Sequence, residues 1–569
     1  RGARESLEQG IRYTPGSQEV EVRRARIYRP SESGTDVDVI EVAGRDDRDL
    51  SEPWYGLYYD VRAEVVLYEG LRPGDIIELS YTLADVSFEN LLRDYFGDVE
   101  LIGDVAPRRR WEYLLLAPAE RKIYVNEPAV PGLERSEVVE GDERLTRFVA
   151  RNVAPVRPEA GMPGWTEVIP YLHLSTFAGW EDVGRWYWQL IADQLAADEP
   201  LRRAARAAIA GAGTTLAQVQ ALHRLVLEST RYVGLEFGIH GYKPYKVTQV
   251  MARRFGDCKD KAALLHVLLR EVGIESEIVL LRTRRSGKVA PFPASLAVFD
   301  HAIVYVPALK LYLDGTAEYS GMRELPSEDQ GVMILRVNQG RAILAETPIF
   351  PASDNRVERD WTATVDERGG GRITEVISVS GQAAPEWREH YETPGERQER
   401  FARVWEGRFP GASLTSVTVE GAEDRNRPVV AKSTVKVAEL AEADGAGLWR
   451  LPLAAREPDY LRSYGRLSSR RQVYLLAYPF EHEERLVYRL PPGWSAVEVP
   501  SPARLTSPFG SVNVTVESIE GGRALRVHSR IAITQNRIAP GEYPAFRAFL
   551  GQIDRALRRT IALRPAGKS

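Results

Sequence analysis

The chain has 569 residues, of which 44% are hydrophobic, so it is too long for one core and has apolar material for about three or four domains. Its 75 basic and 80 acidic side chains are well mixed and give a net charge of -5, which argues against binding to nucleic acid or to an anionic membrane. No apolar run is long enough to cross a bilayer, and a single cysteine excludes an internal disulfide.

The first part of the chain, to about residue 157, has the pattern of a β-rich domain. Short alternating or β-branched runs cover Val37 to Val42, Tyr59 to Tyr68 and Ile76 to Ala84, and turn residues separate them. Strands with short connections and no long helix between them are typical of a β-sandwich or an open barrel. The basic cluster at Arg108 to Arg110 follows a proline, and we interpret it as a solvated turn.

A proline-rich segment from Pro155 to Pro163 predicts the first domain boundary. Two amphipathic helices are expected after it, from Trp180 to about Ala196 and from Thr215 to Thr230. His223 lies on the second helix and is interpreted as a surface or core histidine. The segment from Tyr232 to Val250 is rich in Gly, Tyr and charged residues, and its position before the cysteine predicts a wall of an active-site groove.

The only cysteine, Cys258, lies where a loop becomes a helix. Gly256 is a loop former, Asp257 is a good N-cap, and the run from Lys259 to Glu271 contains no Gly or Pro. Cys258 is therefore expected in the first helical turn, where unpaired backbone N–H groups and the helix dipole favour a thiolate. Most lone cysteines are small buried hydrophobes, but such a residue would lie among the leucines further along the helix.

A reactive thiolate needs a base and a group that orients the base. Two short runs, Phe299 to Val306 and Leu309 to Gly315, flank a turn that contains Pro307, and they predict an antiparallel pair of strands. His301 opens the first strand and Asp314 closes the second, so the pairing is expected to bring them side by side. A histidine at a strand end is more often a surface residue, and an Asp-Gly pair is more often a turn, but the cysteine upstream favours catalysis.

Three motifs resemble the transglutaminase-like cysteine fold of many bacterial proteins: G-D-C-K-D-K-A around Cys258, D-H-A-I-V-Y-V around His301 and Y-L-D-G-T around Asp314. The segment from Arg231 to Pro244 is similar to the stretch before the nucleophile in those proteins. The whole chain resembles the bacterial subgroup in which a β-rich domain of unknown function, DUF3857, precedes this core and β-rich segments follow it. The resemblance is strong over residues 170 to 320, moderate before them and weaker after residue 350. It implies a papain-like arrangement with Cys258 as nucleophile, His301 as general base and Asp314 as orienter.

Three further expectations concern the surroundings of the thiol. An oxyanion hole would use the backbone N–H of Cys258 and one more donor, for which Tyr242 and Gln249 are the candidates. The segment from Arg284 to Ser295 is expected to be a flexible loop that covers the thiol and regulates access. No cofactor and no metal are expected, and three histidines in the C-terminal region have no companions at metal-ligand spacing: His390, His482 and His528.

The β pattern returns after about residue 350. A hairpin is predicted around the turn from Asp366 to Gly370, a charged amphipathic helix from Trp387 to Phe409, and a last helix within Tyr543 to Leu563 that packs on the preceding sheet. The predicted fold is therefore α+β and multidomain. It comprises an N-terminal β-sandwich (1–165), a central transglutaminase-like core (166–350) and a C-terminal β-rich region with one or two subdomains and a terminal helix (351–569).

The leading functional hypothesis is cysteine-dependent acyl transfer on protein or peptide amides. Cys258 would attack the amide carbonyl, His301 would protonate the leaving amine and Asp314 would orient the imidazole. Water as acceptor gives a protease or amidase and an amine gives a transglutaminase, and the same triad serves both. The alternative is a cell-envelope binding or assembly protein with a catalytically quiet core.

Location and partners follow from the resemblance, since relatives of this kind commonly carry export signals. It implies a periplasmic or cell-envelope protein that meets a protein or peptide substrate or an envelope component. The chain begins at Arg1 without methionine, which is typical of a fragment or of a processed product whose signal peptide has been removed.

Overall fold

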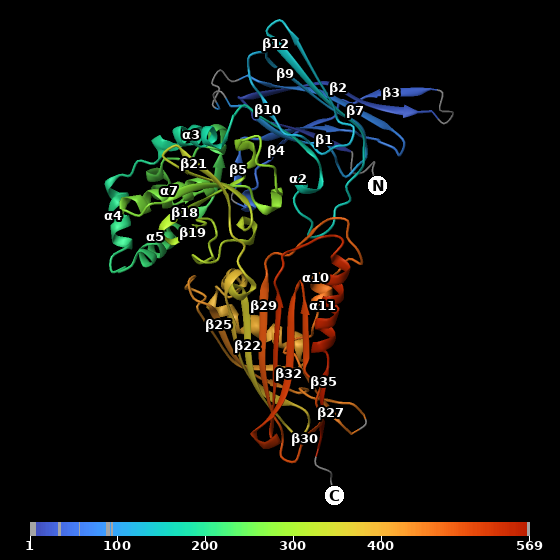
Figure 1. Cartoon of the computed structure of the whole chain (residues 1–569), viewed down its shortest axis with the longest axis vertical. Helices are drawn as coiled ribbons and strands as arrows, with labels where there is room; N and C mark the ends of the chain where they lie inside the picture. Colours follow the sequence, from blue (N-terminus) through green and yellow to red (C-terminus); the bar gives the residue numbers. More distant parts are fainter. Residues whose placement is uncertain are drawn as a thin grey trace.

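The structure is a computed structural model that describes residues 7–31, 36–55, 57–86, 92, 95–445 and 447–565. It has the α+β, multidomain architecture that the sequence predicts, with a β-rich N-terminal part, a mixed core and a β-rich C-terminal part. The two β-rich parts lie at opposite ends of an elongated molecule (Figure 1). Residues 1–4, which suggested a processed chain end, lie outside the described residues.

The N-terminal part is a β-sandwich. Two three-stranded sheets, β1-β6-β4 and β3-β2-β7, pack around the buried side chains of Ala25, Ile27, Val66 and Tyr68. A third sheet has the order β11-β12-β9. The strands of this part are β1 (Glu8–Tyr13), β2 (Gln18–Pro30), β3 (Val37–Glu41), β4 (Arg45–Asp49), β5 (Leu57–Tyr59), β6 (Arg62–Leu67), β7 (Ile76–Asp85), β8 (Gly97–Leu101), β9 (Arg108–Pro118), β10 (Tyr124–Val125), β11 (Glu134–Glu140) and β12 (Glu143–Val153).

The arginine cluster from Arg108 to Arg110 does not form the expected turn. These residues begin β9, which pairs with β12 along its length. The guanidinium of Arg108 donates to the backbone oxygen of Leu101 at 3.0 Å and pairs with Asp104 at 3.1 Å. The turn prediction was wrong because the proline lies just before the strand and does not interrupt it. A strand tolerates charged side chains that alternate onto its exposed face.

The core places helices against one five-stranded sheet of order β19-β18-β17-β20-β21. Leu264, Leu265 and Leu268 of helix α7 are fully buried in the same cluster as Val304 of β18. The core elements are α2 (Trp165–Val168), β13 (Tyr171–Ser175), α3 (Trp180–Ile191), α4 (Glu199–Ala208), α5 (Thr215–Ser229), β14 (Arg231–Tyr232), β15 (Gly234–Glu236), α6 (Val247–Arg253), β16 (Phe255–Gly256), α7 (Cys258–Glu271), β17 (Glu277–Leu281), β18 (His301–Val306), β19 (Leu311–Leu313), β20 (Met333–Asn338) and β21 (Arg341–Glu346).

Two short pairings join the N-terminal part to the core. Strand β13 of the core pairs with β8 and β10, and β15 pairs in parallel with β5. The backbone N–H of Gly238, just after β15, donates to Asp60 at 2.8 Å. The N-terminal part therefore contacts the segment that leads to the cysteine helix.

The C-terminal part is built on an eight-stranded sheet of order β24-β25-β23-β22-β29-β33-β32-β31. The central β22–β29 pair is parallel and joins two antiparallel halves. Apolar side chains of α9 and α11 share one core with the inner face of this sheet. The strands and helices are β22 (Arg356–Val365), β23 (Gly371–Val379), α8 (Ala384–His390), α9 (Arg397–Arg408), β24 (Ser413–Glu420), β25 (Val429–Val437), β26 (Glu442–Ala443), β27 (Trp449–Pro452), α10 (Tyr460–Tyr464), β28 (Tyr474–Leu475), β29 (Phe480–Arg489), β30 (Ser495–Glu498), β31 (Ala503–Ser507), β32 (Gly510–Ile519), β33 (Ala524–Ile533), β34 (Arg537–Ile538), α11 (Tyr543–Leu557) and β35 (Thr560–Arg564).

The single helix expected from Trp387 to Phe409 is two helices. Helix α8 ends at His390 and α9 begins at Arg397, with Pro394 and Gly395 between them. Proline has no N–H to continue the helical hydrogen bonds, and glycine weakens a helix, so the chain turns here. No helix among the described residues is both long and apolar enough for a membrane span.

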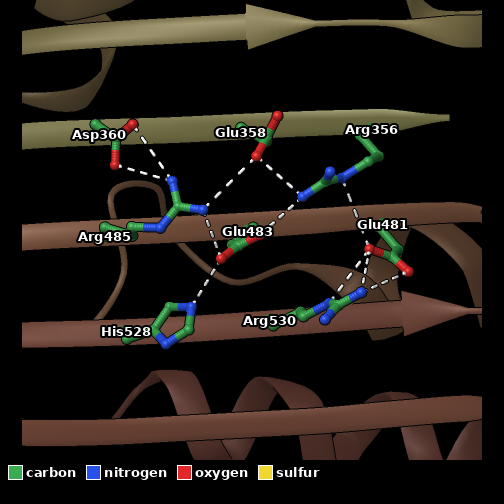
Figure 2. A network of polar contacts seen from close by, with 8 residues as sticks. All are labelled: Arg356, Glu358, Asp360, Glu481, Glu483, Arg485, His528 and Arg530. Atoms are coloured by element: carbon green, nitrogen blue, oxygen red, sulfur yellow. Dashed lines mark hydrogen bonds and ion pairs between the residues drawn. The ribbon is translucent and has the colours of Figure 1, made fainter. Parts of the chain in front are cut away.

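The outer face of the eight-stranded sheet carries a network of paired charges (Figure 2). Glu483 on β29 lies 2.9 Å from Arg356, 2.7 Å from Arg485 and 2.9 Å from His528. Arg530 on β33 pairs with Glu481 at 2.9 Å. Each arginine in this network has a carboxylate partner, so charge on this face is matched across the strands.

Candidate active site

The N-terminus of α7 positions Cys258. Asp257 caps the helix by accepting the N–H of Asp260 at 3.2 Å, and Asp260 accepts the N–H of Asp257 at 3.3 Å, which forms a capping box. Asp260 is held in turn by Arg253 at 2.9 Å and by the backbone N–H of Tyr245 at 2.7 Å. Cys258 is the first residue of the helix and is half-buried, so the predicted N-cap and helix start are confirmed.

The two lysines of this turn are buried and paired. Lys259 contacts the carboxylate of Asp257 and lies 3.4 Å from Glu236. Lys261 donates to the backbone oxygen of Thr230 at 2.8 Å, and burial lowers its pKa. Both lysines therefore anchor the start of α7 in the core.

His301 and Asp314 lie side by side, as the strand pairing suggested. In the β18–β19 pairing, Val304 is opposite Leu313. Continuing this register by one residue puts Asp314 opposite Ile303. The side chain of Ile303 lies on the same face of β18 as that of His301, two residues away. The Nε2 atom of His301 lies 3.3 Å from Oδ2 of Asp314. The other carboxylate oxygen of Asp314 accepts the N–H of Thr316 at 2.7 Å and its hydroxyl at 2.8 Å.

Electrostatics favour charge on both members of this pair. Burial lowers the pKa of His301, but the Asp314 carboxylate and a hydrogen bond with Cys258 outweigh it and raise that pKa well above its usual value. Burial raises the pKa of Asp314, yet His301 and Thr316 outweigh it and lower that pKa. His301 is thus hydrogen-bonded to Asp314 and lies close enough to Cys258 for the sulfur to contribute to its raised pKa.

His223 also belongs to this site, although its sequence position gave no sign of it. It is buried on α5, and its Nε2 atom lies 3.0 Å from the backbone oxygen of Asp314. Burial lowers the pKa of His223, so the imidazole is neutral and donates this hydrogen bond. His223 thereby holds the strand end that carries the Asp314 carboxylate.

A third carboxylate, Asp329, lies beside His301 and Asp314. Atoms of these three side chains lie within 4.8 Å of one another, and Oδ2 of Asp329 is buried with no hydrogen-bond partner in the described part of the chain. Burial and the negative charge of Asp314 raise the pKa of Asp329 to about 8. One imidazole and two carboxylates could hold a metal ion. However, His301 and Asp314 already bind each other, and the raised pKa of Asp329 favours its protonated form, so the arrangement fits a buried acid better than a metal site.

No hydrogen bond among the described residues joins Tyr242 or Gln249 to Cys258, and their role as oxyanion donors stays a prediction. Tyr242 is half-buried at the end of a turn, and burial raises its pKa. Gln249 is exposed on α6. Burial and the nearby charge of Cys258 raise the pKa of Tyr232. Its hydroxyl therefore keeps its proton and can donate.

The segment from Arg284 to Ser295 is tied to the rest of the molecule by hydrogen bonds. Arg284 donates to the backbone oxygen of Ala477 at 2.6 Å, and Ala290 donates its N–H to the Tyr171 hydroxyl at 2.7 Å. The Tyr95 hydroxyl of the N-terminal part lies 2.8 Å from the Ser295 hydroxyl. Contacts from all three parts of the molecule, none visible in local sequence, hold this segment, and its role as a cover over the thiol stays a prediction.

Comparison with known families gives three matches along the chain. Residues 1–157 match DUF3857 and residues 453–563 match DUF3858, both domains of unknown function with solved structures. Residues 202–319, which contain Cys258, His301 and Asp314, match the transglutaminase-like superfamily. No curated protein matches the chain.

One solved structure supports the same fold. A candidate protease from Parabacteroides distasonis ATCC 8503 is similar over 99% of this chain and 93% of its own, with 15% identity and a TM-score of 0.66. A candidate cysteine protease from Cytophaga hutchinsonii covers 39% of this chain and 78% of its own, with 14% identity and a TM-score of 0.18, which is too low to indicate a shared overall fold. The resemblance inferred from the motifs is thus confirmed: the chain carries a segment that matches DUF3857, followed by one that matches the transglutaminase-like superfamily.

Proposed function

We propose that the protein is a cysteine-dependent acyl-transfer enzyme that acts on amide groups of proteins or peptides. The observation that carries this proposal is the His301–Asp314 hydrogen bond beside Cys258, which lies at the start of a buried helix. A nucleophile, a base and an orienting carboxylate in this order are the groups that acyl transfer through a thioester requires. The transglutaminase-like fold of the core supports the same class of chemistry.

In the first half-reaction the Cys258 sulfur attacks the amide carbonyl carbon. The negative charge that develops on the carbonyl oxygen is stabilised by the backbone N–H of Cys258 at the α7 terminus, with the Tyr232 hydroxyl as the second donor. The C–N bond then breaks, His301 gives its proton to the leaving nitrogen, and the acyl group remains on Cys258 as a thioester. Asp314, fixed by Thr316 and His223, accepts the N–H of His301 throughout.

In the second half-reaction His301 removes a proton from the acceptor, which attacks the thioester and releases the Cys258 thiol. Water as acceptor yields a carboxylic acid and makes the enzyme a protease or amidase. A primary amine yields a new amide and makes it a transglutaminase. Both acceptors use the same three residues, so the acceptor is a matter for experiment.

An exported, cell-envelope location stays a prediction.

The experiment incubates the protein with a mixed peptide library, with and without a primary amine, and identifies products by mass spectrometry. New amino and carboxyl termini report hydrolysis, amine adducts on glutamine side chains report transamidation, and an acyl group on Cys258 reports the thioester. Cys258→Ser is expected to abolish all three signals. Equal product formation by the parent and Cys258→Ser would contradict the proposal and favour the alternative of a binding protein with a quiet core.

A further inference from the structure

The C-terminal part contains a cavity of about 560 Å³ that is far from the cysteine in sequence and belongs to other elements. It is bounded by the end of α9, the inner face of β22 and β23, the segment before α10 and the end of α11. Its lining is rich in guanidinium groups, from Arg359, Arg408, Arg450, Arg456, Arg558 and Arg559.

Three of these arginines are neutralised by carboxylates. Arg359 lies 2.5 Å from Glu375 and 3.3 Å from Glu484, which is opposite it across the β22–β29 pair. Arg450 pairs with Glu498 at 2.6 Å, and Arg558 pairs with Glu457 at 3.2 Å. These pairs account for the charge of half of the arginines.

The other three arginines have no carboxylate at ion-pair distance among the residues that the structure describes: Arg408, Arg456 and Arg559. This differs from the outer face of the same sheet, where each arginine of the network has such a partner (Figure 2). The acidic side chains of Glu439 and Glu442 also line the cavity, but they are exposed. Of the three arginines without an ion partner in the described part of the chain, Arg456 is exposed, whereas Arg408 and Arg559 are half-buried.

Arg408 shows the lack of a partner most clearly. Its guanidinium lies over the rings of Trp361 at 5.0 Å and Phe409 at 4.6 Å, and Nη2 donates to the backbone oxygen of Ala454 at 3.0 Å. Its Nε and Nη1 atoms are buried and have no acceptor in the described part of the chain. Burial, and then the positive charge of Arg359, lower the pKa of Arg408 to about 10 against the opposing effect of nearby glutamates.

Two other side chains extend this donor set. Nη2 of Arg559 is buried without an acceptor, while its remaining nitrogens donate to the backbone oxygens of Ala556 at 3.0 Å and Ser501 at 2.7 Å. The guanidinium of Arg456 also lines the cavity, although the residue is exposed. Burying a charged donor without a partner is unfavourable, and guanidinium N–H groups match the oxygens of a carboxylate or a phosphate in pairs.

We propose that this cavity binds a small oxyanion, a carboxylate or a phosphate, through Arg408 and Arg456 with Arg559 beside them. The oxygens of the anion would accept hydrogen bonds from the unpaired N–H groups of Arg408 and Arg559. Its negative charge would pair with the arginines that have no carboxylate partner in the described part of the chain. The aromatic rings and backbone oxygens that already hold Arg408 preorganise it for this role. The site is separate from Cys258, so it stands whether or not the proposed catalysis does.

The test measures the melting temperature of the full chain in sodium phosphate, in sodium acetate and in sodium chloride at matched ionic strength and pH. The variants are Arg408→Gln and Arg456→Gln, with Arg526→Gln as the control because Arg526 is exposed on the outer face and pairs there with Glu517 at 3.6 Å. Cys258→Ser is included so that the result is independent of the active site.

A saturable rise in melting temperature with phosphate or acetate over chloride is expected for the parent, Arg526→Gln and Cys258→Ser. A rise with only one of the two anions assigns the ligand class. The half-saturating concentration should increase at least about tenfold in Arg408→Gln and Arg456→Gln. No rise over chloride in the parent, or the same rise in both cavity variants, would overturn the proposal. If Arg408→Gln fails to fold, calorimetric titration of Arg456→Gln with phosphate and acetate gives the same decision, because Arg456 is exposed and outside the hydrophobic core.

Discussion

The Nε2 atom of His223 on helix α5 lies 3.0 Å from the backbone oxygen of Asp314, 91 residues further along the chain. Both residues are buried, and a carbonyl oxygen can only accept, so Nε2 of His223 carries the hydrogen. The position of the orienting carboxylate thus depends on a neutral histidine from a different element. The catalytic proposal therefore involves two histidines with opposite pKa shifts, His301 raised and His223 lowered.

Replacing His223 should affect both stability and the reactivity of the thiol. His223→Ala leaves the Asp314 backbone oxygen without its donor, which should lower the free energy of unfolding by about 1–3 kcal/mol. It should also slow the labelling of Cys258 by iodoacetamide several-fold, since the orienting carboxylate is no longer fixed.

His266→Ala is the matched control for His223→Ala. His266 is another buried histidine in the same core, on α7, where it lies 3.0 Å from the Ser276 hydroxyl and where burial lowers its pKa to about 4. It should lose comparable stability and keep the labelling rate of the parent. Equal slowing in both variants would show that labelling follows general destabilisation.

The His301–Asp314 pair should give a defined pH dependence of stability. The raised pKa of His301 stabilises the fold fully below its usual value of 6.5, and this contribution is lost as the pH rises through the folded-state pKa. The lowered pKa of Asp314 stabilises above its usual 3.8, and this contribution is lost as the pH falls through the folded-state pKa. Urea midpoints of the parent and Asp314→Asn should therefore differ most between about pH 4 and 6.5 and converge toward alkaline pH. A constant difference across that range would contradict an ion pair.

Asp329 should have the opposite effect on stability. Its pKa of about 8, raised by burial and by Asp314, means that the folded chain keeps a proton that the unfolded chain releases. This makes the parent less stable as the pH rises from about 4 to about 8. Asp329→Asn, which resembles the protonated acid, should gain stability relative to the parent over that interval and change no further above it. Glu328→Gln, at an exposed neighbour, should show no such gain, and a flat difference for Asp329→Asn would rule out the buried acid.

Glu483 offers a test in the C-terminal part. It accepts from Arg356, Arg485 and His528, so Glu483→Gln should lower stability by about 1–3 kcal/mol at neutral pH. Burial raises the pKa of Glu483, but the His528 hydrogen bond and the Arg485 charge outweigh it and lower that pKa. Its stabilisation is present above the usual value of 4.5 and is lost as the pH falls through the folded-state pKa. Thermal unfolding should therefore separate the two proteins at neutral pH and bring them together in acid, whereas a gap that persists in acid would point to packing instead.

Local signals were sufficient for much of the fold and for placing Cys258, His301 and Asp314 at the ends of their elements. The Gly256–Asp257 pair before an uninterrupted run predicted the cap and start of α7, and alternation around His301 and Asp314 predicted their strands. These features depend on neighbours in sequence. Pro394, which breaks the helix, is also a local signal. The charged pattern on both sides of it nevertheless led to the wrong prediction of a single helix.

The features that the sequence did not predict depend on long-range contacts. Asp329 follows Pro326 in what resembles an ordinary acidic turn, and only the approach of this turn to β18 and β19 buries it. His223 looked like any histidine on an amphipathic helix. The β5–β15 pairing joins two strands of three residues each, too short for any periodicity to predict.

The most direct test of the central claim is the rate at which iodoacetamide labels Cys258 from about pH 6 to about pH 9, followed by mass spectrometry in the parent and in His301→Ala. The experiment needs no substrate. If His301 and Cys258 act as one hydrogen-bonded pair, the parent should react at least about tenfold faster than His301→Ala near pH 7, and the two rates should approach each other at alkaline pH. Equal rates in the two proteins across the range would mean that the histidine does not activate the thiol, and the catalytic proposal would then be wrong.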